Sequence, residues 1–262
     1  MRARHGILLT LAYDGSRFSG FAPQKNGVTV AGVLRAAIQQ MDPSVGALRV
    51  ASRTDAGVHA RAQVVCFDTE SDIESRGWLL GLSGHLPPEV AVQRVARVEA
   101  GFNPSKAARA KTYHYWILRG TIRDPFLAGK AWRVHDALDL RAMRDEAQAL
   151  LGTHDFSAFR GAADRRENAV RTMSVAELST IEHSPRCLCF AIRGDRFLYN
   201  MVRIIVGTLV DVVRGQREAG AFARAFVSKE RTDLGMTAPP DGLYLDRVEL
   251  EDWGHAEWPN HW

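Results

Sequence analysis

The segment ALRVASRTDAGVHARAQVVCFD, residues 47–68, decides the expected fold. Its two ends, residues 47–52 and 63–68, are rich in apolar and β-branched side chains and are typical of strands. Between them, Ser52–His59 carries charged residues and a glycine, which is the composition of a loop. The segment therefore predicts two neighbouring strands with a loop at the edge of their sheet.

The elements on both sides of this strand pair complete an α+β unit. A strand is expected over residues 6–13, and a helix over residues 29–41, where apolar residues recur at steps of three and four. After the pair, a short helix over residues 75–82 ends before Pro87, and a strand follows over residues 90–98. The order β-α-β-β-α-β is a known α+β arrangement.

The second half of the chain repeats this order. Its expected elements are a strand over 112–118, a helix over 140–151 capped by Asp139, strands over 169–181 and 187–193, helices over 200–213 and 218–227, and a strand over 242–250. The sequence thus predicts an α+β fold of two similar β-α-β-β-α-β halves, with mainly antiparallel sheets flanked by helices and an active-site cleft between the halves. We place the halves at residues 1–105 and 106–250, followed by a tail over residues 251–262 that has no assigned function.

The composition indicates a globular chain that favours an anionic partner. Its 262 residues are 46% hydrophobic, which suffices for a sizeable core, and its net charge is +4. Three cysteines, an odd number, argue against a disulfide framework and for a reducing cytoplasm, and we expect all three to be buried. The apolar run at residues 7–12 is too short for a signal peptide, and no stretch approaches the roughly 18 apolar residues of a membrane span. We expect a soluble intracellular protein without membrane contact.

Asp55 is the first candidate for chemistry. Arg53, His59 and Arg61 lie close to it in the sequence, and nearby cations keep a carboxylate ionised, as a nucleophile requires, and attract phosphates. The same loop also fits a plain turn in which Gly57 takes a positive φ angle. Spacing alone leaves both interpretations open.

Arg203 is the second candidate. It is the only charge between Met201 and Val210, in a helix that is otherwise apolar. Because an unpaired buried charge is costly, its guanidinium should have a carboxylate partner, either the local Asp211 or a carboxylate at a site. Gly207, one turn later, would let a loop or a ligand approach the helix closely.

Aromatic side chains form the third candidate. In the expected strand, Tyr113 and Tyr115 face the same side. This arrangement suits either an aromatic core or a stacking platform for a displaced base, with a phenol that bonds or relays a proton. Residues 236–245 predict a loop that enters a strand, and composition gives no role to Leu243.

Motifs for several other chemistries are absent from the sequence. It contains no G-x-x-x-x-G-K-[ST], no G-x-G-x-x-G after a strand, no H-E-x-x-H and no G-x-S-x-G. Cys187 and Cys189 lack a second pair of ligands at zinc spacing. The common nucleotide-binding, zinc-protease and hydrolase functions therefore lose support.

Motifs spread over most of the chain resemble the bacterial tRNA pseudouridine synthase A family. The matching segments are Tyr13-Asp14-Gly15 with Gly20-Phe21, the loop from Arg53 to His59, Lys111 to Tyr115, Asp155 to Phe159, Asn200 to Leu209, and Thr237 to Pro239 with Gly242 to Leu245. The loop around Asp55 matches throughout. The number and the order of these motifs argue against coincidence.

This resemblance implies the pseudouridine synthase fold and a cytoplasmic homodimer that isomerises uridine to pseudouridine in the anticodon stem-loop of tRNA. Because this reaction oxidises nothing and transfers no group to water, we expect neither a metal nor a cofactor. It implies Asp55 as the nucleophile, Arg203 as its ion-pair partner and Tyr113 as the residue that stacks on the base. By resemblance, Arg53 helps to hold the target nucleotide out of the stack and Leu243 lines the pocket. From the residue arguments above, we also assign four residues to substrate binding, namely His59, Arg61, Tyr115 and Gly207.

Two segments depart from the family pattern. Ala22-Pro23 stands where a glutamine is usual, and Phe102-Asn103-Pro104-Ser105 lacks a common arginine, which leaves details of RNA binding open. Two other functions stay open as well. One is a glycosidase or nuclease, which needs a second catalytic acid that no spacing selects, and the other is a non-catalytic RNA-binding protein.

Overall fold

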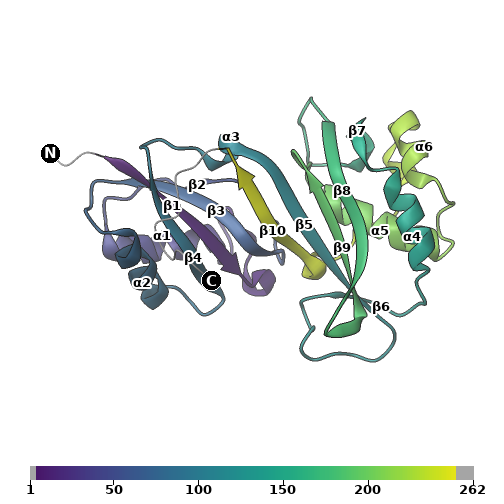
Figure 1. Ribbon diagram of the computed structural model, residues 1–262, viewed down its shortest axis with the longest axis horizontal. Coiled ribbons are helices and arrows are strands. Elements are labelled where there is room, and N and C mark those ends of the chain that lie inside the picture. Colours follow the sequence, from purple (N-terminus) through teal and green to yellow (C-terminus); the bar gives the residue numbers. More distant parts are fainter. Residues whose placement is uncertain (1–3, 252–262) are drawn as a thin grey trace. The chain divides into compact units, whose positions relative to one another are not determined.

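The computed structural model describes residues 4–251, so the predicted tail from residue 252 onward lies outside the described residues. The described chain divides into two compact units. One contains the residues up to 109 together with those from 245 onward, and the other contains residues 110–244. Figure 1 shows that each unit combines sheet strands with helices.

The first unit has the predicted β-α-β-β-α-β order. Its elements are β1 (His5–Tyr13), α1 (Val30–Met41), β2 (Arg49–Val50), β3 (His59–Thr69), α2 (Ser75–His85), β4 (Val90–Val98) and the short α3 (Pro104–Ala107), with a 3-10 helix at Gly15–Arg17. Strand β1 pairs antiparallel with β3 and with β4, and β2 pairs antiparallel with β3. The last strand, β10 (Leu243–Leu250), lies next to β3 in the sheet. Its residues from 245 onward therefore group with the first unit, whereas the sequence placed this strand in the second half.

Helices α1 and α2 form where the apolar periodicity predicts them. Helix α1 is capped by Thr29, whose Oγ1 accepts a hydrogen bond of 3.2 Å from the amide of Gly32. Helix α2 packs against the sheet through Trp78, whose ring meets that of Phe67 on β3 edge to face, with 5.1 Å between the centroids. The buried side of α1 consists of Val30, Ala31, Leu34, Ala37 and Ile38.

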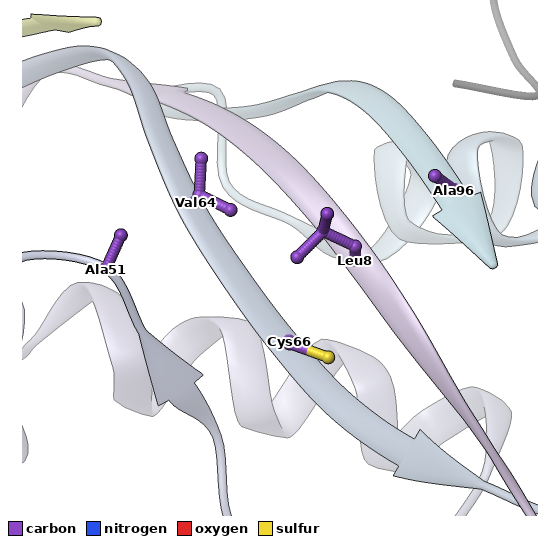
Figure 2. Packing of buried hydrophobic residues seen from close by; sticks show 5 residues of the cluster. All are labelled: Leu8, Ala51, Val64, Cys66 and Ala96. Atoms are coloured by element: carbon purple, nitrogen blue, oxygen red, sulfur yellow. The ribbon is translucent and has the colours of Figure 1, made fainter. Parts of the chain in front are cut away.

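A further apolar cluster packs on the other face of the same sheet. Val64 and Cys66 alternate with Phe67 along β3, so their side chains point away from α2. Figure 2 shows the buried members of the cluster, which are Leu8, Ala51, Val64, Cys66 and Ala96. Partly buried side chains of Phe102 and Val248 pack against it. Both faces of this sheet thus carry packed apolar side chains.

The second unit contains mainly antiparallel strands together with helices. Its elements are β5 (Ala108–Arg119), β6 (Trp132–Val134), α4 (Leu140–Gln148), β7 (Gly152–Asp155), β8 (Val170–Ile181), β9 (Ser184–Gly194), α5 (Met201–Val213) and α6 (Ala221–Ser228), with 3-10 helices at Ser157–Phe159, Arg231–Asp233 and Pro240–Gly242. Strands β5, β9, β8 and β7 follow one another in antiparallel pairs, and only β6 pairs parallel, with β5, among the described pairings of this unit. The predicted α+β class with mainly antiparallel sheets is confirmed.

Two carboxylates fix the helix ends of the second unit. Asp139 caps α4 as predicted, because its Oδ1 accepts from the amides of residues 141 and 142 at 2.9 and 3.1 Å. Glu146, buried on α4, accepts from the amides of Gly220 and Phe222 at the start of α6, at 2.7 and 2.9 Å. A carboxylate at a helix N-terminus satisfies amides that have no partner within the helix.

The structure differs from the sequence prediction in three short elements and in several boundaries, of which the start of β3 bears on the candidate site. Strands β6 and β7 and helix α3 were not predicted, because segments of three or four residues carry no usable periodicity. Strand β3 begins at His59, four residues before the predicted start at Gln63. The alanines at 60 and 62 hide the strand pattern, but Ala60 pairs with Tyr13 of β1. His59 and Arg61 therefore lie on a strand and not in the loop.

The three cysteines are free and buried, as expected. Among the described residues, no helix combines the length and the apolar character needed to cross a bilayer.

Truncation of Leu8 tests the cluster in Figure 2. Leu8 is 2% exposed, so Leu8→Ala should leave a cavity and lower the free energy of unfolding by roughly 2–5 kcal/mol, measured by urea denaturation. Leu80→Ala on α2 is the control. Because Leu80 is 53% exposed, this variant should lose little of the free energy of unfolding. Equal, small losses in both variants would contradict the packing described here.

Candidate active site

Buried polar side chains support the loop that carries Asp55. The Tyr13 hydroxyl lies 2.7 Å from Oγ1 of Thr54. Gln63 Nε2 donates to the carbonyl of Ser52 at 2.7 Å and to the Tyr13 hydroxyl at 3.3 Å. Gln63 and Tyr13 are buried, so these hydrogen bonds form away from water and fix the backbone on the N-terminal side of Asp55.

The segment after β1 clamps the same loop through its backbone. The amide of Phe21 donates to the carbonyl of Thr54 at 3.0 Å, and the amide of Gly57 donates to the carbonyl of Phe18 at 3.3 Å. Gly20, with φ of 93°, lies so close that a side chain there would come within 2.9 Å of the Thr54 carbonyl oxygen. This explains why the Tyr13-Asp14-Gly15 and Gly20-Phe21 motifs accompany the Asp55 loop in the sequence.

The loop itself contains the turn that its glycine predicts. Gly57 has φ of 78°, and the amide of Val58 donates to the carbonyl of Asp55 at 3.1 Å. Asp55 is half-buried at this turn, and Arg53 is exposed. The turn interpretation is thus correct for the backbone, and the chemical role of Asp55 stays a prediction.

His59 has a place that the sequence did not predict. Its side chain is 2% exposed, and its Nδ1 accepts a hydrogen bond of 3.0 Å from the amide of Gly15. Asp14 Oδ1 also lies 3.1 Å from this Nδ1, but a backbone amide can only donate, so Nδ1 is the acceptor here. His59 therefore supports the turn after β1, and its assignment to RNA binding stays a prediction. The side chain of Arg61 is half exposed, and its Nη1 lies 3.7 Å from Oδ1 of Asp246.

Arg203 is bound on two sides by neighbouring groups of the second unit. Its Nε donates to the carbonyl of Ala238 at 2.7 Å, and its Nη1 donates to Oδ1 of Asn200 at 2.9 Å. In return, the amide of Ala238 donates to the carbonyl of Arg203 at 3.0 Å. These hydrogen bonds fix the plane of the guanidinium relative to α5.

The segment from Gly235 to Ala238 is hydrogen-bonded along one side of α5, and we call it the latched segment. The amide of Gly235 donates to Thr208 Oγ1 at 2.9 Å, and the amide of Met236 donates to Oδ2 of Asp211 at 2.8 Å. Asp211, offered above as a local partner for Arg203, lies two turns further along the helix, roughly 12 Å at 1.5 Å per residue, and binds Met236 instead.

Gly207 provides the close approach that the sequence predicted. A Cβ at this position would overlap the carbonyl oxygen of Met236 and lie 3.2 Å from the amide nitrogen of Ala238. The group that approaches the helix is thus the latched segment of the same chain, and the assignment of Gly207 to substrate binding stays a prediction.

The two tyrosines of β5 have different surroundings. Tyr115 is fully buried, and its hydroxyl donates to the carbonyl of Pro239 at 2.7 Å. Burial raises the pKa of this phenol well above its ordinary value, so it stays protonated as a donor. Tyr113 packs edge to face against Phe197, with 4.9 Å between the ring centroids. The aromatic-core interpretation therefore fits Tyr115, which stabilises the segment that also holds Arg203.

The predicted site residues fall into two sets. Asp55, Arg53, His59 and Arg61 belong to the first unit, and Leu243, which is 6% exposed, belongs to the second. The remaining members of the second set are Arg203, Gly207, Tyr113 and Tyr115. Within residues 4–251, no group of three or more His, Cys, Asp or Glu side chains is placed to hold a metal ion.

Sequence reasoning missed several residues that build these sets. Tyr13, Thr54 and Gln63 form the buried support of the Asp55 loop, and Asn200 and Ala238 hold Arg203. Gln63 gave one signal, a polar side chain at the start of an apolar strand run. The backbone groups of Ala238 gave none.

Comparisons with known proteins agree on one family. A family model described as tRNA pseudouridine synthase matches residues 10–103 and 147–250. A tRNA pseudouridine synthase A of Myxococcus xanthus is 39% identical over 253 residues, which cover 97% of this chain and 95% of the relative. One of Geobacter sulfurreducens is 40% identical over 93% of this chain and 99% of the relative. One of Halalkalibacterium halodurans is 40% identical over 93% of this chain and 92% of the relative.

Gly207→Ala tests the latch on α5. The added methyl must displace Met236 and Ala238, so the free energy of unfolding should fall by roughly 1–3 kcal/mol and any activity that depends on Arg203 should fall with it. The matched control is Gly84→Ala in helix α2, where the new Cβ meets no atom within 4 Å. The control should be neutral or slightly stabilising. The latch would be refuted if Gly207→Ala were as stable and active as Gly84→Ala.

Proposed function

Because the chain belongs to the tRNA pseudouridine synthase family, we propose that Asp55 is the carboxylate with which it isomerises uridine to pseudouridine in tRNA. The observation that carries this proposal is the support of the Asp55 loop. Buried hydrogen bonds from Tyr13 and Gln63 hold the residues before Asp55, and a tight turn follows it. Such support keeps a reactive side chain in one geometry before the substrate binds.

The isomerisation requires a nucleophile and a bound, everted base. The bond from uracil N1 to the ribose breaks, the ring rejoins the ribose through C5, C5 loses its hydrogen as a proton, and N1 takes up a proton. No atom is oxidised and no group passes to water, so we propose a reaction without a metal or a cofactor. The ionised Asp55 acts as the nucleophile toward the everted uridine. Eversion costs a few kcal/mol, and less where the uridine is only partly stacked, as in a loop.

The second unit supplies the partner groups in this proposal. Arg203 pairs with Asp55, and a guanidinium favours the ionised carboxylate. The fixed orientation of Arg203, through Ala238 and Asn200, supports this role, because an oriented charge needs no rearrangement during the reaction. Tyr113 stacks on the base and Leu243 lines its pocket.

RNA contacts complete the proposed site. Arg53, exposed beside Asp55, helps to hold the target nucleotide out of the stack. We assign Arg61, also accessible, to the phosphates. We keep His59, Tyr115 and Gly207 among the substrate-binding residues, although each of them also supports the turn after β1 or the latched segment. We propose the anticodon stem-loop as the substrate region and a cytoplasmic homodimer as the working form. The net charge of +4 supports an RNA partner.

The two other functions considered above predict different products. A glycosidase would release free uracil, whereas an isomerase releases only the hydrogen from C5. With tRNA labelled with tritium at C5 of uridine, we expect tritium in water and no free uracil. A non-catalytic RNA-binding protein would give neither product.

Asp55→Asn tests the nucleophile. The amide cannot act as a carboxylate nucleophile, so this variant should bind tRNA with roughly wild-type affinity but form no pseudouridine in the tritium-release assay. Asp72→Asn is the control, because its carboxylate is 69% exposed, and it should keep full activity. Turnover of Asp55→Asn near that of the wild type would refute the assignment.

Arg203→Leu tests the ion-pair partner. Loss of a charge that stabilises the reacting carboxylate should lower kcat by roughly 100-fold or more while the fold persists, as judged by circular dichroism. Arg141→Leu replaces an arginine that is 92% exposed on α4 and should leave kcat unchanged. An Arg203→Leu enzyme with unchanged kcat would reject the pairing.

A further inference from the structure

Asn200 has an unusual backbone conformation at the start of α5. Its φ is 61° and its ψ is 3°, in the left-handed region. Among the described residues other than glycine, only Asn200 and Lys229 have a positive φ. Side chains beyond glycine adopt this conformation at a cost in free energy, although asparagine tolerates it better than most residues. A strained residue persists only where its surroundings hold it.

The side chain of Asn200 does not perform the task usual for its position. An asparagine that precedes a helix normally accepts a hydrogen bond from an amide of the first turn, but Asn200 makes no such bond. Its Oδ1 accepts from Nη1 of Arg203 instead, at 2.9 Å. The side-chain oxygen that would usually cap the helix therefore binds the guanidinium that we pair with Asp55.

The neighbouring residue Tyr199 holds the strained turn from outside. Its amide donates to Oδ2 of Asp164 at 2.7 Å, and its carbonyl accepts from the amide of Gly161 at 2.8 Å. Asp164 is in turn bound by Arg166, whose hydrogen bonds keep the pKa of that carboxyl well below its usual range. A Cβ at Gly161 would lie 3.1 Å from Nδ2 of Asn200 and closer still to the Tyr199 ring, so the segment also limits the position of the amide.

We propose that Asn200 is a positioning residue for the isomerisation, which orients the Arg203 guanidinium through its strained backbone and its amide oxygen. Asn200 holds Nη1 and the Ala238 carbonyl holds Nε, so two directions of the planar guanidinium are fixed. A guanidinium held at both points keeps one orientation toward the reacting carboxylate. This inference rests on the proposed function, in which Arg203 is the partner of Asp55.

Asn200→Gly separates positioning from a purely structural role. Glycine accepts the left-handed conformation without strain, so the melting temperature should stay the same or rise. The acceptor for Nη1 is lost, however, so kcat should fall about tenfold while KM for tRNA changes little, as expected for a group that acts in the transition state. The matched control is Lys229→Gly at the other strained position, which lies at the end of α6 and should keep the wild-type kcat.

Two further measurements keep this proposal falsifiable. Asn200→Asp also tolerates the left-handed backbone and keeps an oxygen acceptor, so it should retain more of the kcat than Asn200→Gly. In a double-mutant cycle, Asn200→Gly should add little to the loss caused by Arg203→Lys, because Asn200 acts through Arg203. The proposal is overturned by a wild-type kcat in Asn200→Gly, by equal losses in the Gly and Asp variants, or by fully additive losses in the cycle.

The outcomes for Arg203→Leu distinguish this inference from the proposed function. If Arg203→Leu is inactive and Asn200→Gly is fully active, only the role of Asn200 fails. If Arg203→Leu itself is fully active, the pairing with Asp55 fails, and the role of Asn200 fails with it.

Discussion

The reciprocal hydrogen bonds between Arg203 and Ala238 are the constraint on which the second unit's part of the site depends. The side chain of Arg203 reaches the carbonyl of Ala238, and the amide of Ala238 returns to the carbonyl of Arg203. Thr208 and Asp211 bind the preceding amides of the same segment, and Gly207 leaves the space that it occupies. One helix face therefore carries a charge and also the backbone that orients it.

In the first unit, hydrogen bonds likewise fix the loop that carries Asp55. Its loop is fixed by Tyr13 and Gln63 from the sheet and by the backbone of Phe21. In both units, hydrogen bonds between residues far apart in sequence fix a candidate site residue, through the backbone before Asp55 and through the side chain of Arg203. Preorganised groups of this kind cost no rearrangement during a reaction, which suits the roles that we propose for Asp55 and Arg203.

Periodicity and capping residues predicted what is local. The apolar face of α1, the Asp139 cap and the space above Gly207 all followed from spacing along one element. Partners distant in sequence could not be predicted. His59 resembled an exposed cation of the loop, yet strand pairing extends to it and buries it against Gly15. The sequence places Asn200 in the helix itself, because no sequence pattern reports a positive φ at asparagine. Strands as short as β6 and β7 form only in the context of their neighbours.

The proposed isomerisation depends on a negatively charged side chain at position 55 that meets the oriented guanidinium of position 203 beside an everted uridine. The most direct measurement is a crystal structure of the protein bound to its tRNA. We predict that an Asp55 oxygen lies within about 4 Å of a guanidinium nitrogen of Arg203, with the target base against Tyr113. An Asp55 side chain directed into solvent, away from both Arg203 and the base, would contradict the account.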